Sequence, residues 1–338
     1  MSELHQVIQR AGHDLLYMPQ CWRCALETVR LYPAQRKLAR ASRALLRAAL
    51  RTRIPLPLTK GAPPAVEWQS VEWCGDDPDL RCPAAVGVLA GNPHAEGRRY
   101  TYLAFDENAK ALYIAKIGFS DAARKRIRRE RDFLRLHADR VDGIPKVFGS
   151  LETLSHSGFI IPYFKGRTPD WHADVNDLDR VLLPWVDTTR KVPLAAIPAW
   201  ASLSGIDACA AISDQEVHPV IHHGDFAPWN MLVESDGRWR VMDWERGDAE
   251  GVPGWDWFHY VIQPALLVDR VTPAVVRQRI DTCLTSARFV AYAQQTRIVG
   301  SEEALLHGYL HYSLALLADN KEGADATCLR AGLHALLS

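Results

Sequence analysis

Three oxygen-bearing side chains, Asp225, Asn230 and Asp243, flank two short runs of β-branched and aliphatic residues. The runs cover residues 231–233 and 239–242, and the Ser-Asp-Gly between them is typical of a tight turn. A hairpin of this kind places Asp225 and Asn230 on the loop that enters it and Asp243 at its exit. We therefore expect all three side chains at one end of the hairpin.

This set of side chains suits the transfer of a phosphoryl group. Such a transfer needs little covalent help from a protein, but it needs a positioned hydroxyl group and Mg²⁺ held against the phosphates. Magnesium prefers oxygen ligands and keeps several waters, so Asn230 and Asp243 suffice as its protein ligands. Asp225 is then left to accept the proton of the attacking hydroxyl. The alternative is an ordinary Asp–Asn loop followed by a capping Asp.

The order of these residues matches a kinase catalytic loop followed by a metal-binding Asp. Two stretches carry the match, His223-Gly-Asp-Phe-Ala-Pro-Trp-Asn230 and Met242-Asp-Trp-Glu245. They resemble the aminoglycoside phosphotransferase and choline-kinase-like family of small-molecule kinases, in which the loop reads His-Gly-Asp and Trp-Glu often follows the metal Asp. The resemblance implies a bilobal α+β fold of the protein-kinase type, ATP and Mg²⁺ as cofactors, and His223 together with Asp225 as catalytic residues.

A second Asp follows soon after this motif. Gly251-Val-Pro-Gly-Trp-Asp256 resembles the part of the family in which an Asp at the start of a helix braces the catalytic loop, although an ordinary helix-capping Asp fits the same pattern. Asp243 and Asp256 are close in sequence, whereas a protein kinase needs a long activation segment with an Ala-Pro-Glu-like anchor between them. The acceptor is therefore expected to be a small molecule and not a folded protein.

Upstream, three strand-like segments resemble the first strands of a kinase amino-terminal lobe. They cover residues 85–90, 100–105 and 111–117 and are rich in β-branched, aromatic and aliphatic residues. The first gap, from Gly91 to Gly97, corresponds to the loop that folds over the ATP phosphates, so Gly91 is a candidate nucleotide-binding residue. The gap departs from the Gly-x-Gly-x-x-Gly spacing, and as a phosphate-binding signal it is weak.

Lys116 lies inside the apolar strand Tyr113-Ile-Ala-Lys-Ile, which resembles the Val-Ala-Ile-Lys strand of kinases. A lysine is costly to bury unless it is paired. Ser120 can cap the next helix, on which Glu130 shares one face with Ile127, Leu134 and His137 at helical spacing. We predict an inward ion pair between Lys116 and Glu130, with Lys116 contacting the ATP phosphates. An edge-strand lysine and a solvated charged helix face are the alternatives.

Two further strands, residues 147–151 and 158–163, complete the predicted lobe. Pro162-Tyr-Phe-Lys-Gly166 corresponds to the hinge of the family, where backbone groups bind adenine, and Tyr163 is the candidate residue there.

The rest of the chain is expected to be mainly helical. Residues 170–218 read as mostly helical, with a core helix over residues 197–212. After Asp256 we expect three more helices, from Thr272-Pro273 to about 292, from Ser301 to about 319, and from about 324 to 337.

The amino-terminal part of the chain is strongly basic. Residues 1–53 contain ten basic and three acidic residues, a balance of +7, and two prolines divide them into what reads as about three helices. Leu4, Val7 and Ile8 start an apolar stripe at helical spacing. The last helix, within residues 33–53, is amphipathic and basic, so peripheral contact with an anionic membrane is one interpretation. A helical extension packed on the kinase lobe is the other.

These patterns divide the chain into four segments. They are a helical basic amino-terminal extension (1–53), a Pro-rich connector (54–84) in which Trp68 and Trp73 contact the adjoining domain, a kinase amino-terminal lobe (85–165) and a carboxy-terminal lobe with the catalytic loop and acceptor-binding helices (166–338).

Composition excludes several other classes of function. The 338 residues carry a formal charge of zero, so no bulk attraction to nucleic acid is expected. No apolar run reaches the length of a membrane-spanning helix, and the first residues lack the pattern of a signal peptide. Seven unevenly spaced cysteines then suggest reduced thiols in the cytoplasm. Cys21-Trp-Arg-Cys24 is a lone pair, which is weak evidence for a metal site.

The charge of the carboxy-terminal segment and the loop motif both bear on the identity of the acceptor. Seven acids and seven bases lie between Asp269 and the carboxy terminus, a balance that argues against a polycationic aminoglycoside. The loop resembles those of relatives associated with bacterial glycan synthesis, so a sugar or glycolipid hydroxyl is the preferred acceptor. An antibiotic kinase and a non-catalytic nucleotide-binding scaffold stay open as alternatives, and the motifs do not separate ATP from GTP as the donor.

Overall fold

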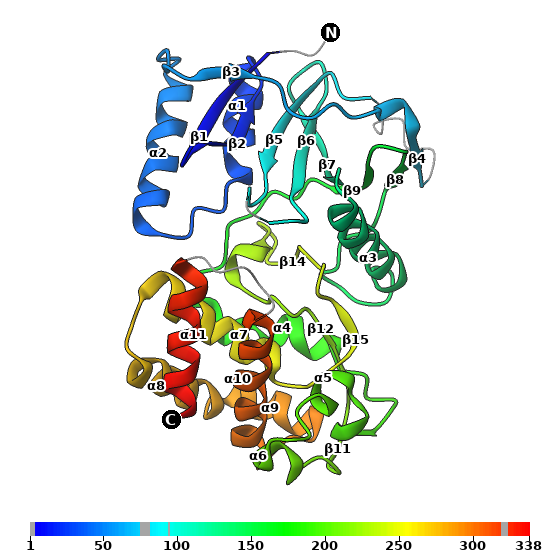
Figure 1. The fold of residues 1–338 in the computed structure, drawn as a ribbon, viewed down its shortest axis with the longest axis vertical. Coiled ribbons are helices and arrows are strands. Elements are labelled where there is room, and N and C mark those ends of the chain that lie inside the picture. Colours follow the sequence, from blue (N-terminus) through cyan, green and yellow to red (C-terminus); the bar gives the residue numbers. More distant parts are fainter. Residues whose placement is uncertain (1–3, 75–81, 94, 319–323) are drawn as a thin grey trace. The chain divides into compact units, whose positions relative to one another are not determined.

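The computed structural model describes residues 4–74, 82–93, 95–318 and 324–338. The chain divides into two compact units. Unit 1 comprises Met1–Asp139 and Pro145–Lys165, and unit 2 comprises Arg140–Ile144 and Gly166–Ser338. The α+β class expected from the sequence is confirmed, because one large antiparallel sheet lies in unit 1 and most of the helices lie in unit 2 (Figure 1).

Among the described residues, unit 1 forms a nine-stranded sheet in which every neighbouring pair of strands is antiparallel. The strand order is β3-β1-β2-β5-β6-β7-β9-β8-β4. The strands are β1 (His5–Arg10), β2 (His13–Met18), β3 (Thr59–Gly61), β4 (Val71–Trp73), β5 (Ala85–Ala90), β6 (Arg99–Phe105), β7 (Ala111–Gly118), β8 (Gly149–Glu152) and β9 (Ser157–Pro162). The five strands predicted between residues 85 and 163 are therefore confirmed, with boundaries shifted by one or two residues.

The prediction that residues 1–53 are helical is wrong for residues 5–18. They form the hairpin of β1 and β2, which pairs with β5 and so extends the sheet. Ala11 and Gly12 connect the two strands with φ values of 50° and 79°, the left-handed conformation that two-residue hairpin turns require. The spacing of Leu4, Val7 and Ile8 fits a helix or a strand in so short a segment, and pairing with the sheet decided between them.

Both faces of β2 are buried, which explains its run of consecutive apolar residues. Tyr17 packs with Val7, Val88 and Tyr102 on one face of the sheet. On the other face, β2 and two helices enclose a second cluster made of Leu16, Met18, Ala25, Val29 and Leu50. The helices are α1 (Trp22–Thr28) and α2 (Lys37–Arg51), and they are the helical part of the predicted extension.

The segment predicted as an irregular connector also contributes to the sheet. β3 pairs with β1, and β4 pairs with β8, so the description of residues 54–84 as irregular throughout is wrong. The prolines isolate strands of only three residues, which a pattern search overlooks. Trp68 and Trp73 contact Tyr113, and Trp68 also contacts Tyr102, as expected for residues that pin the segment to the sheet. The predicted connector residue Pro78 lies outside the described residues.

The helix after β7 agrees with its prediction. α3 (Asp121–His137) begins at Ser120, whose hydroxyl accepts a hydrogen bond from Ala123 N at 3.2 Å. Its buried face contains Ala123, Ile127, Glu130, Leu134 and His137.

Unit 2 contains three two-stranded sheets and most of the helices. β10 (Val192–Pro193) pairs with β11 (Glu216–Val217), β12 (Val220–His222) with β15 (Asp248–Gly251), and β13 (Met231–Val233) with β14 (Trp239–Val241). The helices are α4 (Asp179–Leu182), α5 (Pro198–Ala201), α6 (Asp207–Ala210), α7 (Trp255–Pro264), α8 (Pro273–Leu284), α9 (Ala287–Thr296), α10 (Glu302–Ala318) and α11 (Ala324–Leu337). Single-turn segments are η1 (Val29–Leu31) and η2 (Trp68–Ser70) in unit 1, and η3 (Asp174–Asp177), η4 (Leu183–Trp185), η5 (Leu194–Ala196), η6 (Pro228–Asn230) and the π-helical η7 (Ala265–Asp269) in unit 2.

Two predicted helices in unit 2 are broken. In place of the core helix expected over residues 197–212, the structure has two one-turn helices, α5 and α6. Ser204 and Gly205 lie between them, and serine and glycine both favour a turn over a continuous helix. The helix expected over residues 273–292 divides into α8 and α9 because Ser286 caps the second of them. None of the helices in the described part of the chain is long and apolar enough to cross a membrane.

Candidate active site

The hairpin expected to carry the site is present in unit 2. Met231 pairs with Val241, and Gly237 turns the chain with a φ of 85°. The ladder continues beyond the strands, because Met242 N donates a hydrogen bond to Asn230 O at 2.8 Å. Asn230 and Met242 therefore lie opposite each other, and Asp243 follows directly at the open end of the hairpin.

Asp225 and Asn230 are joined side chain to side chain. Asn230 Nδ2 donates to Asp225 Oδ2 at 2.8 Å and to the Asp225 backbone oxygen at 2.9 Å. These bonds use both protons of the amide nitrogen and leave Asn230 Oδ1 as an acceptor. A hard cation requires an oxygen ligand of this kind.

The second oxygen of Asp225 has a partner that the sequence did not reveal. His259 Nε2 lies 3.1 Å from Asp225 Oδ1, and the Asp225 side chain keeps 34% of its surface exposed. Burial acts to raise the pKa of Asp225, but the hydrogen bond from His259 and the charge of Arg246 outweigh it and lower the pKa below its usual range. Asp225 is thus an ionised carboxylate that still faces open space.

His223 does not reach that space. The residue is fully buried, its Nε2 lies 3.0 Å from Met242 O, and its Nδ1 accepts a hydrogen bond from Asp225 N at 3.2 Å. Burial lowers the pKa of His223, so the ring is neutral. Trp244 packs edge-on against the ring at a centroid distance of 4.6 Å. His223, which we expected to be catalytic, is a buried imidazole with both ring nitrogens engaged inside the protein, so its catalytic role stays a prediction.

Asp256 braces the loop, as its place in the sequence led us to expect. Its carboxylate accepts hydrogen bonds from His223 N at 2.9 Å and from Gly224 N at 3.3 Å. Gly224 has a φ of 76°, and a Cβ there would lie 2.9 Å from Arg246 Cβ, so only glycine fits this turn. One buried carboxylate on α7 thus holds the backbone from which Asp225 projects.

Asp243 adopts a φ of 72°, which is rare for a residue with a side chain. Asn230 and Asp243 offer one amide and one carboxylate oxygen, a set that fits Mg²⁺ because this ion retains most of its waters. No group of three or more His, Cys, Asp or Glu side chains within the described residues is arranged to hold a metal ion.

In unit 1, the ion pair expected between Lys116 and Glu130 is present. Lys116 Nζ lies 2.5 Å from Glu130 Oε1, and the two side chains are 12% and 1% exposed. Lys116 is held in the centre of the sheet, opposite Thr101 on β6 and Phe159 on β9. Lys116 is therefore not on an edge strand, because β7 is paired on both sides. Glu130 is not on a solvated helix face, because its side chain is buried.

Gly91 and Tyr163, the other two candidate nucleotide-binding residues of unit 1, both make contacts within the protein. Gly91 N donates to Arg99 O at 2.8 Å, and a Cβ on Gly91 would lie 2.7 Å from the same oxygen, so the hairpin of β5 and β6 requires glycine there. Tyr163 donates its hydroxyl to Glu27 Oε2 at 2.8 Å, and burial together with Glu27 raises its pKa to about 12. α1 therefore contacts the predicted hinge segment.

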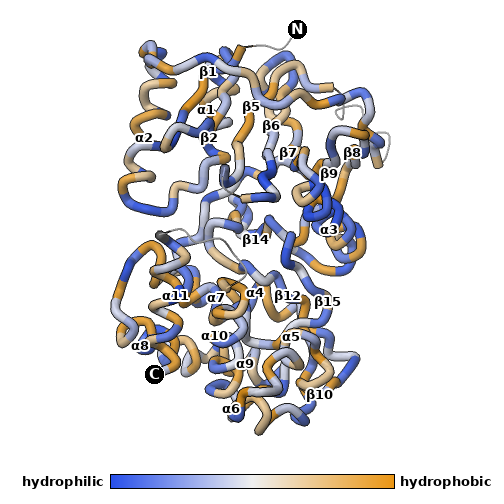
Figure 2. The backbone as a smooth tube through the Cα atoms, viewed as in Figure 1, coloured by the Kyte–Doolittle hydropathy of each residue, from blue (hydrophilic) through white to orange (hydrophobic). Residues whose placement is uncertain are grey.

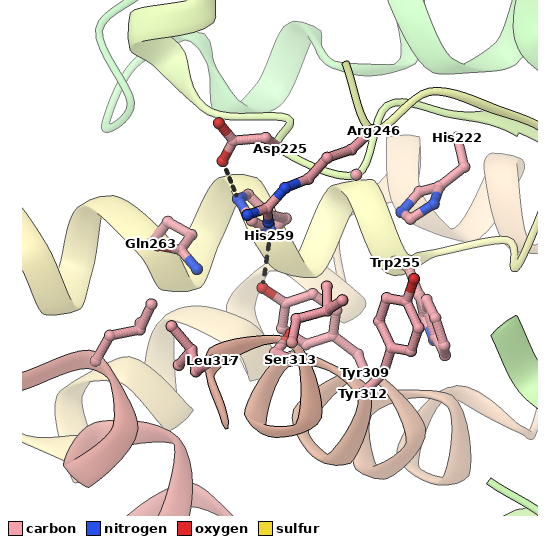
Figure 3. Close-up of a pocket in the computed structure, with 13 residues that line it drawn as sticks. His222, Asp225, Arg246, Trp255, His259, Gln263, Tyr309, Tyr312, Ser313 and Leu317 are labelled. Atoms are coloured by element: carbon pink, nitrogen blue, oxygen red, sulfur yellow. Dashed lines mark hydrogen bonds and ion pairs between the residues drawn. The ribbon is translucent and has the colours of Figure 1, made fainter. Parts of the chain in front are cut away.

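A cavity of about 180 Å³ opens beside Asp225 within unit 2 (Figure 3). Its lining comes from the end of β12 and the loop after it, from the segment between β14 and β15, and from α7, α10 and α11. The lining residues are His222, Gly224, Asp225, Arg246, Trp255, His259, Gln263, Tyr309, Tyr312, Ser313, Leu316, Leu317 and Leu329. Among the described residues that line it, Asp225 is the single acid. The sequence analysis expected carboxy-terminal helices around an acceptor but missed Arg246, His259 and the tyrosines; the spacing of Asp256 and His259 on one face of α7 was the available signal.

Comparisons with known proteins give a similarity of fold. No family model matches the chain, and no curated protein sequence matches it. Solved structures do: a choline kinase from Streptococcus pneumoniae is 16% identical with a TM-score of 0.40, over 74% of this chain and 92% of that one. An aminoglycoside phosphotransferase solved with ADP and hygromycin B is 15% identical with a TM-score of 0.46, over 75% and 93% of the two chains. Another, solved with streptomycin and ATP, is 16% identical with a TM-score of 0.42, over 75% and 91%.

At these values the likeness assigns no substrate and no residue role to this chain.

Proposed function

We propose that the protein transfers the γ-phosphoryl group of ATP to a hydroxyl group of a small molecule. This proposal is carried by the open end of the β13–β14 hairpin. There Asn230 is hydrogen-bonded to Asp225 and lies opposite Met242, the residue that precedes Asp243. Asp225 is ionised and partly exposed, as a base that must meet a substrate has to be.

Asp225 accepts the proton of the acceptor hydroxyl as the hydroxyl oxygen bonds to the γ-phosphorus. The bond from that phosphorus to the β,γ-bridging oxygen breaks, and ADP leaves with the bond's electron pair. Asn230 Oδ1 and the Asp243 carboxylate would hold Mg²⁺, which would neutralise charge on the phosphates. Within unit 1, Lys116, which is held by Glu130, binds the ATP phosphates, and backbone groups near Gly91 and Tyr163 bind the rest of the nucleotide.

The cavity beside Asp225 supports a sugar-like acceptor. Trp255, Tyr309 and Tyr312 provide aromatic surfaces, while Ser313, Gln263 and His222 provide polar groups in the same lining. A polycationic aminoglycoside needs several carboxylates, but among the described residues that line the cavity Asp225 is the single acid, and Arg246 adds a positive charge. We therefore rank a sugar or glycolipid hydroxyl above an antibiotic.

Thermal stability with nucleotides tests this function. Unfolding would be followed with Mg²⁺ and ATP, with Mg²⁺ and GTP, and with ATP in EDTA, for the wild type, Asp243→Ala and Asp236→Ala. Asp236 lies on the same hairpin in its exposed turn, so its loss controls for damage to the hairpin. A ligand that binds only the folded state raises the melting temperature.

We expect a metal-dependent rise in the wild type and in Asp236→Ala, and a much smaller rise in Asp243→Ala. A screen of sugars and aminoglycosides for phosphoryl transfer then identifies the acceptor. The absence of any shift at millimolar nucleotide in the wild type would reject the kinase and favour a scaffold.

We also propose that residues 33–53 contact an anionic membrane surface. Residues 28–66 contain nine arginines and lysines and no aspartate or glutamate. On α2, Leu38 and Leu45 are 84% and 72% exposed, and with Ala41 and Ala48 they form a stripe at three- and four-residue spacing. Figure 2 shows apolar and polar residues alternating along this helix.

An exposed apolar stripe flanked by arginines fits a bilayer better than nucleic acid, because nucleic acid offers charge but no apolar layer. Co-sedimentation with phosphatidylglycerol and with phosphatidylcholine vesicles tests this contact. We expect binding to phosphatidylglycerol alone, weakened by salt and by Leu38→Ser with Leu45→Ser. Leu154→Ser is the matched control, since Leu154 is fully exposed elsewhere in unit 1. Equal loss in the control, or binding to neither vesicle, rejects the surface.

A further inference from the structure

The base of the proposed reaction sits at the end of a buried hydrogen-bonded chain. His259 Nε2 lies 3.1 Å from Asp225 Oδ1, and the hydroxyl of Tyr309 lies 3.1 Å from His259 Nδ1 (Figure 3). His259 comes from α7 and Tyr309 from α10. His259 and Tyr309 are 7% and 3% exposed, so little water reaches these hydrogen bonds.

The direction of each hydrogen bond follows from its chemistry. An ionised carboxylate can only accept, so His259 Nε2 carries the proton that points at Asp225. In a neutral ring Nδ1 is then an acceptor, and the Tyr309 hydroxyl donates to it. Burial raises the pKa of Tyr309, although hydrogen bonds from Ser313 and Gln263 oppose this, and the hydroxyl keeps its proton.

We propose that His259 is a positioning residue for Asp225, and that Tyr309 holds it in the Nε2-protonated tautomer that this requires. The proposal rests on the proposed role of Asp225 as the base. Asn230 anchors one carboxylate oxygen and His259 the other, so the plane of the carboxylate is set from two sides. Its remaining lone pairs then face the cavity in which an acceptor hydroxyl would lie.

His259 also lines that cavity, but its two nitrogens are engaged within the protein. It therefore acts through Asp225 and takes no proton from the acceptor. A histidine that merely filled space in α7 would not need a fixed tautomer, and this difference makes the two roles separable.

Nitrogen-15 NMR of the histidine rings is the first test, on the full chain without ligand. We expect His259 to show a protonated Nε2 and an unprotonated, hydrogen-bonded Nδ1. Asp225→Asn should shift the Nε2 resonance, and Tyr309→Phe should shift Nδ1 and admit the other tautomer. A His259 signal that shows rapid exchange between tautomers in the wild type, or that ignores both substitutions, overturns the proposal.

Turnover is the second test, measured as hydrolysis of Mg·ATP with water in the acceptor's place and as transfer to a panel of hexoses. His259→Leu should lower kcat roughly 10- to 100-fold, a part of what a general base contributes, with the KM for Mg·ATP unchanged. His259→Gln keeps a donor near the Nε2 position and should recover most of the rate. His334→Gln, at an exposed site on α11, is the matched control.

A double-mutant cycle isolates the path of the effect. In an Asp225→Asn background, His259→Leu should cause no further loss, because the residue acts only through that carboxylate. Additive losses, or a Leu variant as active as the wild type, overturn the positioning role. A wild type that turns over neither water nor any sugar rejects the proposed function instead, and the NMR result then still decides whether His259 is tied to Asp225.

Discussion

Glu130 Oε1 and Lys116 Nζ lie 2.5 Å apart, and the glutamate side chain is only 1% exposed. The pair joins α3 to β7 in the middle of the unit 1 sheet. Arg99 Nη1 is the next cation, 3.9 Å from the other carboxylate oxygen. A buried ion pair contributes little net stability, but breaking it leaves a charge that the protein interior cannot solvate.

Glu130→Ala is therefore expected to destabilise the protein by about 3–5 kcal/mol, the usual cost of removing one partner of a buried pair. Asp236→Ala removes a partner from an exposed pair with Arg238 and should cost at most about 1 kcal/mol. Urea denaturation compares the two. If both variants lost the same small amount, the Lys116–Glu130 pair would not be buried in solution.

Asp225→Asn is expected to reduce kcat about 10²- to 10⁴-fold, the range of a positioned general base. The isosteric amide keeps the shape of the loop and the bond from Asn230 Nδ2 to an oxygen. The rise in melting temperature with Mg²⁺ and ATP should therefore persist. Near-normal turnover in this variant would show that another group takes the proton.

Leu16→Ala is expected to cost about 2–5 kcal/mol, because Leu16 is buried against α1 and α2 and its loss leaves a cavity. Leu45→Ala changes the same residue type at an exposed site of α2 and should change stability by less than about 0.5 kcal/mol. Thermal or urea unfolding measures both. Equal stability of the two variants would contradict the packing of the amino-terminal hairpin into unit 1.

Gly251→Ala is expected to destabilise the protein by about 1–3 kcal/mol, as overpacking does. A Cβ on Gly251 would lie 2.1 Å from His222 Cβ, across the pairing of β12 and β15. Gly205 has no atom within 4 Å of a Cβ and an ordinary φ, so Gly205→Ala should be neutral or slightly stabilising. Urea midpoints of the two alanine variants decide whether β12 and β15 approach this closely.

Cys21 and Cys24 are expected to differ in reactivity. Burial raises the pKa of the Cys24 thiol to about 12. For Cys21, burial acts to raise the pKa, but hydrogen bonds from Cys24 and from the Arg23 backbone and the Arg23 charge prevail and lower it. Because the thiolate reacts, iodoacetamide at neutral pH should label Cys21, increasingly as the pH rises, and spare Cys24. Peptide mass spectrometry locates the label, and equal labelling would contradict this environment.

Local patterns in the sequence were enough to predict many of the strands and the loop of the candidate site. The loop from His223 to Asn230, the β13–β14 hairpin and the five strands between residues 85 and 163 follow from residue types and spacing within a few positions of each other. The Lys116–Glu130 pair could also be predicted, because Lys116 in an apolar strand requires a partner and Glu130 was the one acid on the right face of the next helix.

Only the tertiary structure decided the features that depend on distant parts of the chain. Residues 5–18 carry too short a pattern to separate a helix from a strand, and pairing of β2 with β5 selected the strand. His223 belongs to the catalytic motif, yet Trp244 and Met242 bury it. His259 reaches Asp225 because Asp256 docks α7 beneath the loop, and the orientation of its ring depends on Tyr309 from α10. Periodicity reveals which face of a helix is buried, but not which buried group on another element that face will meet.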